Sequence, residues 1–428
     1  MTDVKRVLFI DNVVSPSGTN IRPREHREID IILKSKKYAP YMVVSEPLIV
    51  KKPRLFLKTK SFNDSRVQIY RVPCLILGSL SSNRSLGKFG KLMFGLCNAL
   101  FQCIYIVHLT LLVLTLAFVK RIDLLHAHNP PDLTGLVALI LSRIKRIPYV
   151  FEVHDRAPEL YCGEMGFSHS SLVYKLMKAI EHQVVINADG VITVNKRVAK
   201  YFSSFAGQTP VAIYTGTKLN INEFSNTAGD ENRLLNKRLI LYQGSLNMAS
   251  IGEPAMYNLM LPLKALPSIL NNFPDVVLVY VGEGSGRRKL ERTALSMGLK
   301  NKVIFTGFIE QKRVFDWIGR AYIVLVPYAD NPNCQTTVPT KLYEYMAFGK
   351  PIVATDFPGI AEIITNERNG LLYNVKSLSD FIKCLLRLLE DFDLAQRLAL
   401  NAKQDFFSKY SLEKNWPKLL LLYDSITN

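Results

Sequence analysis

Short apolar segments alternate with longer amphipathic segments along most of the chain. In the first half, the segments typical of buried strands are Val7–Ile10, Leu124–His128, Tyr149–Val153 and Gly190–Val194. Helical periodicity lies between several of these strands, in Leu133–Ile144 and in Leu172–Ala188. Such alternation predicts an α/β fold, in which a parallel sheet carries helices on both faces.

The alternation resumes after a polar segment, from Gly207 to Arg238, that contains no long periodic helix. The later strand candidates are Leu239–Gln243, Val276–Val281, Val303–Thr306, Ile323–Val326 and Ile352–Ala354. Because 428 residues exceed the usual size of one hydrophobic core, two domains are expected. We predict doubly wound α/β domains at 1–206, which includes an apolar helix at 92–119, and at 239–405. A linker at 207–238 joins them, and a helix at 406–428 is expected to pack back on the first domain.

The stretch VPTKLYEYMAFGKPIVATDFPG, from Val338 to Gly359, predicts a helix followed directly by a short strand. Pro339 suits the first turn of a helix, and Gly349 suits a left-handed residue just after its end. Lys341 and Glu344 are three residues apart near the start of this helix, so they share one face.

Polar residues and glycines directly follow several of the predicted strands. His154 and Asp155 follow the third strand, Gly282 follows the strand ending at Val281, and Gly18 lies in the loop after the first strand. Open parallel sheets bind ligands beyond the carboxyl ends of their strands. Two such domains facing one another would form a ligand-binding cleft lined by these residues.

The Val338–Gly359 stretch resembles the nucleotide-sugar motif of the retaining GT-B glycosyltransferases called group 1, or family 4. The segment VYVGEGSGRRKLERTALSMGLKNKVIFTGFI supports the resemblance, which covers nearly the whole chain and is strongest from Leu239 to Tyr373. The resemblance implies two Rossmann-like domains and transfer of a hexose from a nucleoside-diphosphate sugar to a glycan or lipid-linked acceptor. It also implies retention of anomeric configuration, with no metal and no cofactor beyond the co-substrate.

Several residues take donor-binding roles through this resemblance. The family glutamate at the position of Glu344 accepts hydrogen bonds from ribose hydroxyls, for which one carboxylate offers enough acceptor sites. Lys341, at the positive end of its helix, suits a diphosphate. Gly18 matches a glycine loop that lets the backbone approach the phosphates, and Gly244 and Gly282 join it as donor-binding candidates. The plainer alternatives are a surface lysine, a solvated glutamate and ordinary turn glycines.

His154 and Asp155 are the catalytic candidates that the resemblance implies. His154 matches a histidine of the N-terminal domain that contacts the transferred sugar, and Asp155 could orient its ring or contact the acceptor. A plain strand-end histidine is the alternative. Catalysis of this kind requires stabilisation of the leaving diphosphate and positioning of the acceptor hydroxyl, so we nominate no carboxylate nucleophile.

Three features depart from the family pattern. Thr336 stands where relatives commonly have a second glutamate that touches the donor sugar, and the segment YTGTKLN lacks their Asn-Gly turn. The segment 245–263 contains no arginine or lysine, although a phosphate-binding basic pair is expected there. Lys341 is the first candidate for this charge, and the other candidates are Lys264, Arg287 and Arg288.

The net charge of +18 favours anionic partners, and no nucleic-acid-binding signature appears. Segment 92–119 carries no formal charge and exceeds the roughly 20 residues that span a bilayer. A span would separate the first strand from the rest of its sheet, so we expect either a buried crossover helix or, by preference, an interfacial helix. The six cysteines form no CxxC pair, which favours a reducing compartment. We therefore expect a cytoplasmic protein, peripheral at the inner face of the membrane.

Two other functions remain open from the sequence. A nucleotide-sugar 2-epimerase-like enzyme would use a similar fold without an acceptor, and a non-catalytic scaffold would keep the fold without the chemistry. His126 and His128 alternate on one strand and point the same way, as two metal ligands would. Because the sequence shows no third ligand nearby, we predict no metal site.

Overall fold

The computed structural model describes residues 4–11, 23–49, 67–76, 88–130, 132–165, 168–214, 216, 234, 236–248, 255–331 and 334–428. The chain divides into two compact units, and each is described by itself. The first contains Met1–Tyr214 together with Trp416–Asn428, and the second contains Thr215–Asn415. The last helix of the chain therefore belongs to the first unit.

Among its described residues, the first unit has a seven-stranded parallel sheet with the order β3-β2-β1-β4-β5-β6-β7. The strands are β1 (Lys5–Ile10), β2 (Tyr38–Ile49), β3 (Gln68–Ile76), β4 (Leu124–His128), β5 (Tyr149–Val153), β6 (Gly190–Thr193) and β7 (Val211–Ala212). The strand order reverses between β1 and β4, which is the switch point where such sheets bind ligands.

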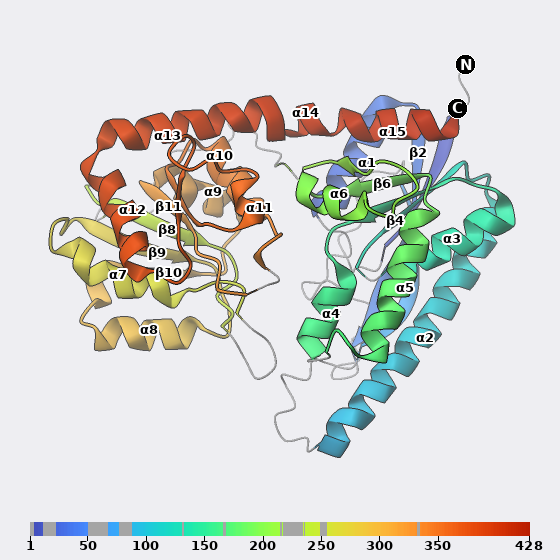
Figure 1. The fold of residues 1–428 in the computed structure, drawn as a ribbon, viewed down its shortest axis with the longest axis horizontal. Helices are drawn as coiled ribbons and strands as arrows, with labels where there is room; N and C mark the ends of the chain where they lie inside the picture. The colour runs from blue at the N-terminus through green and yellow to red at the C-terminus, as the bar shows by residue number, and fades with distance from the viewer. Residues whose placement is uncertain are drawn as a thin grey trace. The chain divides into compact units, whose positions relative to one another are not determined.

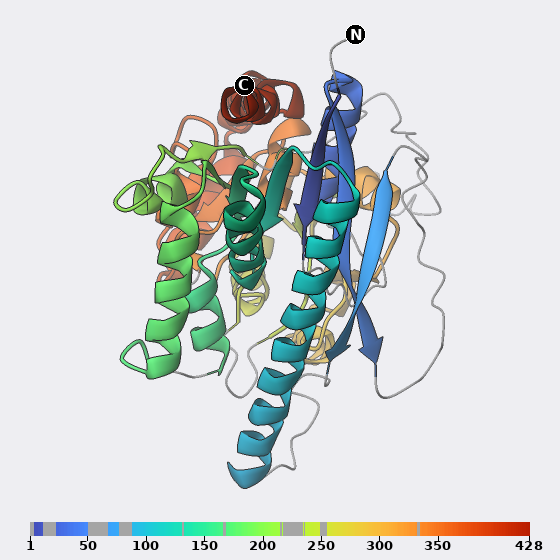
Figure 2. The same cartoon turned by 90° about the vertical axis from the view of Figure 1, so that its right-hand side faces the viewer.

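Helices cover both faces of this sheet (Figures 1 and 2), and the side chains that they contact differ between the two faces. On one face, α2 (Lys88–Val119), α3 (Leu133–Lys145) and α5 (Leu172–Ile186) pack against apolar strand residues such as Leu125 and Phe151. On the other face, α1 (Pro23–Ser35) and α15 (Pro417–Thr427) contact polar and aromatic strand residues. The remaining helices of the unit are α4 (Ala157–Met165) and α6 (Lys196–Phe202).

The second unit has a six-stranded parallel sheet in its described part, with the order β10-β9-β8-β11-β12-β13. The strands are β8 (Arg238–Gln243), β9 (Val276–Val281), β10 (Val303–Gly307), β11 (Ile323–Val326), β12 (Ile352–Thr355) and β13 (Leu371–Tyr373). Its helices are α7 (Met260–Leu270), α8 (Arg287–Ser296), α9 (Gln311–Arg320), α10 (Thr340–Ala347), α11 (Pro358–Ala361), α12 (Leu378–Glu390), α13 (Phe392–Asp405) and α14 (Leu412–Asn415). The strand order reverses between β8 and β11.

The predicted fold class is confirmed, because both units are Rossmann-like parallel sheets with helices. Strands β4, β5, β9 and β11 have the predicted bounds, and the other predicted strands differ by one or two residues. No pattern in the sequence predicted α1, β2 or β3. Helix α1 reads PREHREIDIILKS, in which charged residues interrupt the apolar stripe.

The apolar segment predicted as a helix at 92–119 lies within α2. Its described side chains form a buried stripe, which contains Tyr105, Leu109 and Val113. A second apolar stripe faces outward, where Val107 is 56% exposed and Leu111 is 57% exposed. In the part of the chain that the structure describes, no helix has both the length and the apolar content that crossing a bilayer requires.

Gly135 of α3 marks a close approach between that helix, α5 and the sheet. A Cβ atom there would lie 2.4 Å from Val184 Cγ1 and 2.6 Å from the Phe151 ring. We predict that Gly135→Ala lowers the free energy of unfolding by about 1–3 kcal/mol because of overpacking. Urea unfolding followed by circular dichroism measures the change.

Gly319 of α9 provides the matched control for this substitution. A Cβ atom there would meet only the Phe348 ring, at 3.8 Å, which is ordinary van der Waals contact. Gly319→Ala should therefore leave stability unchanged or raise it by up to about 1 kcal/mol, because alanine is the better helix former. An equal effect of the two substitutions would contradict the packing argument.

Candidate active site

Helix α10 joins β11 to β12 and so begins beside the switch point of the second sheet. Pro339 precedes its first residue with extended backbone, and Gly349 adopts the predicted left-handed conformation with φ of +60°. Every residue from Lys341 to Ala347 is buried, so the helix is buried all round and not only along one stripe. Two ionisable side chains of α10, Lys341 and Glu344, are thus held away from water.

The ammonium group of Lys341 lies in a niche of aromatic rings. Its Nζ atom is 3.9 Å from the ring centroid of Tyr257 and 4.2 Å from that of Tyr242. The side chain is 8% exposed, and no described residue accepts a hydrogen bond from Nζ. Burial lowers the pKa of Lys341 to about 7, against the opposing effect of the Glu344 carboxylate. A buried ammonium with so little compensation is suited to binding an anion.

Two glycines without side chains allow close packing at the niche: Gly244 lies next to Lys341 Nζ, and Gly282 lies next to Gly244. A Cβ atom on Gly244, whose φ is +136°, would lie 2.6 Å from Lys341 Nζ. A Cβ atom on Gly282, whose φ is +140°, would lie 2.0 Å from the carbonyl oxygen of Gly244. Gly244 therefore leaves room for the ammonium group, and Gly282 lets the loop after β9 pack against the loop after β8.

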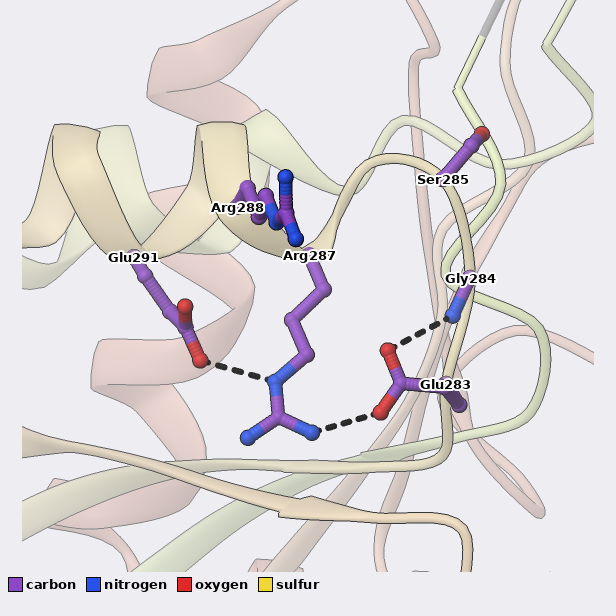
Figure 3. A pocket seen from close by; sticks show the side chains of 6 residues that line it. All are labelled: Glu283, Gly284, Ser285, Arg287, Arg288 and Glu291. Carbon is purple, nitrogen blue, oxygen red and sulfur yellow. Dashed lines mark hydrogen bonds and ion pairs between the residues drawn. The ribbon is translucent and has the colours of Figure 1, made fainter.

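Arg287, a donor-binding candidate from the sequence, is engaged by two glutamates in the pocket of Figure 3. Its guanidinium contacts Glu283 at 2.5 Å and Glu291 at 2.7 Å. The pocket has a volume of about 450 Å³ and is also lined by Gly284, Ser285 and Arg288. Because both glutamates already compensate Arg287, its charge is less available to a new anion than that of Lys341.

In the first unit, the Asn129 side chain fixes the backbone that carries His154 and Asp155. Its Oδ1 atom accepts hydrogen bonds from the backbone N–H of His154 at 2.7 Å and of Asp155 at 3.3 Å. Its Nδ2 atom donates to the Asp155 carbonyl at 2.7 Å and to Asp132 Oδ1 at 2.9 Å. Asn129 follows β4 and His154 follows β5, so one amide holds two strand ends together. Asn129 directly follows the strand predicted at Leu124–His128, and no functional role was predicted for it.

The His154 ring lies against a buried polar cluster, which we define as Arg24, Glu28, His126, His128 and Glu152. Its Nε2 atom is 3.1 Å from His128 Nδ1 and 3.4 Å from Glu152 Oε1. His154 is 12% exposed, whereas the cluster is buried. The exposed edge of the ring thus has a rigid polar support behind it.

The pKa values of the two glutamates in this cluster are shifted in opposite directions. Burial, with Glu152 close by, raises the pKa of Glu28 well above its usual range. Burial opposes ionisation of Glu152 as well, but Arg24 and the surrounding histidines hold its pKa well below the usual range. The sequence indicated only His126 and His128, because Glu28 lies on the unpredicted helix α1 and Glu152 reads as part of a buried strand.

The remaining sequence candidates lie elsewhere. Gly18 lies outside the described residues. Lys264 is exposed on α7, and Thr336 contributes its backbone to packing, since a Cβ atom on Gly359 would lie 2.7 Å from the Thr336 carbonyl carbon. Of the candidates, the structure thus brings Lys341, Glu344, Gly244 and Gly282 together in the second unit. It places His154 and Asp155 side by side in the first.

Comparison with known proteins agrees with this division of the chain. Residues 241–391 match a family model described as glycosyl transferases group 1, and residues 99–213 match one described as a glycosyl transferase 4-like domain. The chain therefore belongs to the group 1 glycosyltransferases.

Individual relatives share less than a third of their aligned residues with this chain. An uncharacterized glycosyltransferase of Methanocaldococcus jannaschii is 29% identical over 68% of this chain and 73% of its own length. The alpha-D-kanosaminyltransferase of Streptomyces kanamyceticus is 22% identical over 70% of this chain and 77% of its own. The crystal structure of HepE of Anabaena in complex with UDP superposes with a TM-score of 0.69 at 16% identity, covering 98% of this chain and 100% of that one. This last likeness establishes the GT-B fold.

The burial of Lys341 should give stability a distinct dependence on pH. The folded form loses the Lys341 proton near pH 7, whereas the unfolded chain keeps it to about pH 10. Between these values the unfolded state binds more protons, so the free energy of unfolding should rise with pH. We predict that Lys341→Met removes much of this rise between about pH 7.5 and pH 9.5, as measured by urea unfolding.

Lys350 also contributes to the pH dependence of the free energy of unfolding. Burial lowers its pKa to about 8, and Lys403 acts in the same direction, so Lys350 adds a slope of the same sign in both proteins. The expected result is therefore a smaller slope in Lys341→Met and not a flat profile. Identical slopes would show that the ammonium of Lys341 is hydrated.

Proposed function

We propose that this protein is a retaining glycosyltransferase that moves a hexose from a nucleoside-diphosphate sugar to a hydroxyl of a glycan or lipid-linked acceptor. The observation that carries the proposal is the Lys341 niche at the switch point of the second sheet. A buried ammonium from which no described residue accepts a hydrogen bond is unfavourable by itself and becomes favourable when an anion occupies the niche.

A diphosphate meets the requirements of the niche. Lys341 lies in the first turn of α10, where the helix dipole adds positive potential. Gly244 leaves a gap beside Nζ through which phosphate oxygens can approach the backbone. Binding of the dianion would favour the protonated form of Lys341 and so restore the full charge of the lysine when the leaving group needs it.

Glu344 would select a nucleoside at the other end of the same ligand. It is 6% exposed and lies one helical turn after Lys341, on the same face of α10. A carboxylate accepts two hydrogen bonds from vicinal hydroxyls, which a ribose provides. Several structural neighbours are complexes with UDP or UDP-glucose, and this supports a nucleotide sugar as the partner.

In the first unit, His154 and Asp155 would contact the transferred sugar and the acceptor. Negative charge grows on the departing diphosphate, so the main catalytic requirements are its stabilisation and the positioning of the acceptor hydroxyl. No carboxylate nucleophile is required, and no metal ion enters this step. Glu152, the nearest glutamate of the strand, is fully buried behind His154 and cannot reach a sugar.

The outward apolar stripe of α2 supports an acceptor at a membrane surface. Exposed apolar side chains of the neighbouring helix α3, Ile140 and Ile144, add to it. Lys145 lies 3.9 Å from the centroid of the Phe118 ring, which places a positive charge beside the apolar surface. Apolar residues flanked by basic ones suit the interface of an anionic membrane.

The donor site is tested by titration calorimetry with UDP and with GDP. We predict that one nucleotide binds to the wild type and that Glu344→Ala weakens this binding by about 10- to 100-fold, since a buried ribose contact is lost. Glu390→Ala, at an exposed position of the same unit, is the control and should bind like the wild type. Failure of both nucleotides to bind would favour the scaffold alternative.

The membrane surface is tested with the double variant Val107→Glu, Leu111→Glu. Two charges on the exposed stripe should abolish co-sedimentation with vesicles containing phosphatidylglycerol, because burying a charge in the interface is costly. Leu400→Glu, whose leucine is 65% exposed on α13 of the second unit, is the matched control and should still sediment. Equal binding of all three proteins would place the membrane contact elsewhere, and absent wild-type binding would leave α2 as a crossover helix.

A further inference from the structure

We propose that Glu28, His126, His128 and Glu152 form a closed site for one divalent transition-metal ion, for which Zn²⁺ is the best match. The four side chains come from α1, β4 and β5, and each is fully buried. One ligand atom from each lies within 4.8 Å of the others. This inference does not depend on the proposed function.

The spacing of the facing atoms matches two ligands of a common ion. His126 Nε2 lies 3.3 Å from Glu152 Oε2, and His128 Nε2 lies 3.4 Å from Glu28 Oε2. Zinc ligands at bonds of about 2.0–2.1 Å stand about 3.3–3.4 Å apart in a tetrahedron. The two pairs already have this separation, and the other ligand atoms, which lie within 4.8 Å of one another, would close by up to about 1.4 Å through side-chain rotation.

Buried polar atoms that lack a hydrogen bond from any described residue face one another across the site. They are Oε2 of Glu28, Nε2 of His126 and Oε2 of Glu152. Such atoms are rare in folded proteins, because burial removes their hydrogen bonds to water and no new hydrogen bond compensates for the loss. A metal ion would satisfy all of them at once.

Neighbouring side chains contact the atoms of the ligands that face away from the site, and so orient the ligands. Tyr423 of α15 contacts Nδ1 of His126, and His154 contacts Nδ1 of His128, so each imidazole directs Nε2 into the site. Arg24 contacts Oε1 of Glu152 and lies 3.4 Å from Oε1 of Glu28. The Oε2 atoms of both glutamates remain directed at the histidines, so Arg24 and the ion need not compete.

The charge count also leaves room for a dication. Glu28, Glu152 and the adjacent buried Asp11 would carry three negative charges when ionised, and Arg24 carries one positive charge. With neutral histidines, a divalent ion brings this buried region to neutrality. Four protein ligands with no exposed position define a structural site and not a catalytic one, and the ion would fix the support behind His154.

The test begins with the full-length protein stripped by a chelator and then dialysed against ZnCl₂. We expect one equivalent of zinc per chain by elemental analysis. The Tm should rise by about 5–10 °C at a hundredfold excess over Kd. MgCl₂ should give neither result, because magnesium prefers oxygen ligands. A stripped protein that stays folded and takes up no zinc overturns the proposal.

Variants separate the buried site from surface binding. Glu28→Gln keeps the shape of the side chain and should lose both the zinc and the Tm shift. Asp132→Asn, a second buried carboxylate of the first unit outside the cluster, should keep both. Zinc that binds equally to Glu28→Gln would be surface zinc and would overturn the proposal.

Cobalt substitution keeps the proposal testable if Glu28→Gln does not fold. Wild-type protein loaded with Co²⁺ should show the intense visible absorption of a tetrahedral ion. The weak bands of an octahedral, hydrated ion would overturn the assignment.

Discussion

The buried ion pair between Arg24 and Glu152 links helix α1 to strand β5 in the first unit. Arg24 is the second residue of α1, Glu152 is the fourth residue of β5, and both are buried. The same guanidinium donates to the Ile213 carbonyl just after β7 at 3.0 Å and lies 5.0 Å from the ring centroid of Trp416, where the C-terminal segment rejoins this unit. Removing one partner of such a pair costs about 3–5 kcal/mol, so the arrangement of α1 and of the C-terminal segment depends on it.

The buried cation of the second unit, Lys341, has different surroundings from Arg24, and this difference bears on function. Arg24 has carboxylates in contact, whereas Lys341 faces two tyrosine rings and Gly244. Aromatic faces stabilise an ammonium less than a carboxylate in contact would. The charge of Arg24 is thus compensated by carboxylates within the first unit, whereas Lys341 leaves a positive niche in the second unit that an anion can complete.

Local patterns in the sequence were sufficient to predict most of the central strands and the pair of charged residues on α10. Strands such as β9 and β11 are continuous apolar runs because both faces of a parallel sheet are covered, and Lys341 and Glu344 lie three apart on one helix. The polar cluster could not be predicted in this way. His126 contacts Tyr423 across 297 residues of sequence, and a buried Glu152 between apolar neighbours looks like any strand residue until the topology is known.

The two faces of the first sheet explain why this cluster can exist beside an apolar helix. In β4, Leu125 and Ala127 face α2 and α3, while His126 and His128 face α1 and α15. Alternation therefore lets one strand serve an apolar surface on one side and a polar core on the other. The partly exposed His154 ring lies against this buried polar cluster, so its position depends on the buried groups that it contacts. Any ion or proton that orders those groups also sets the geometry of the histidine.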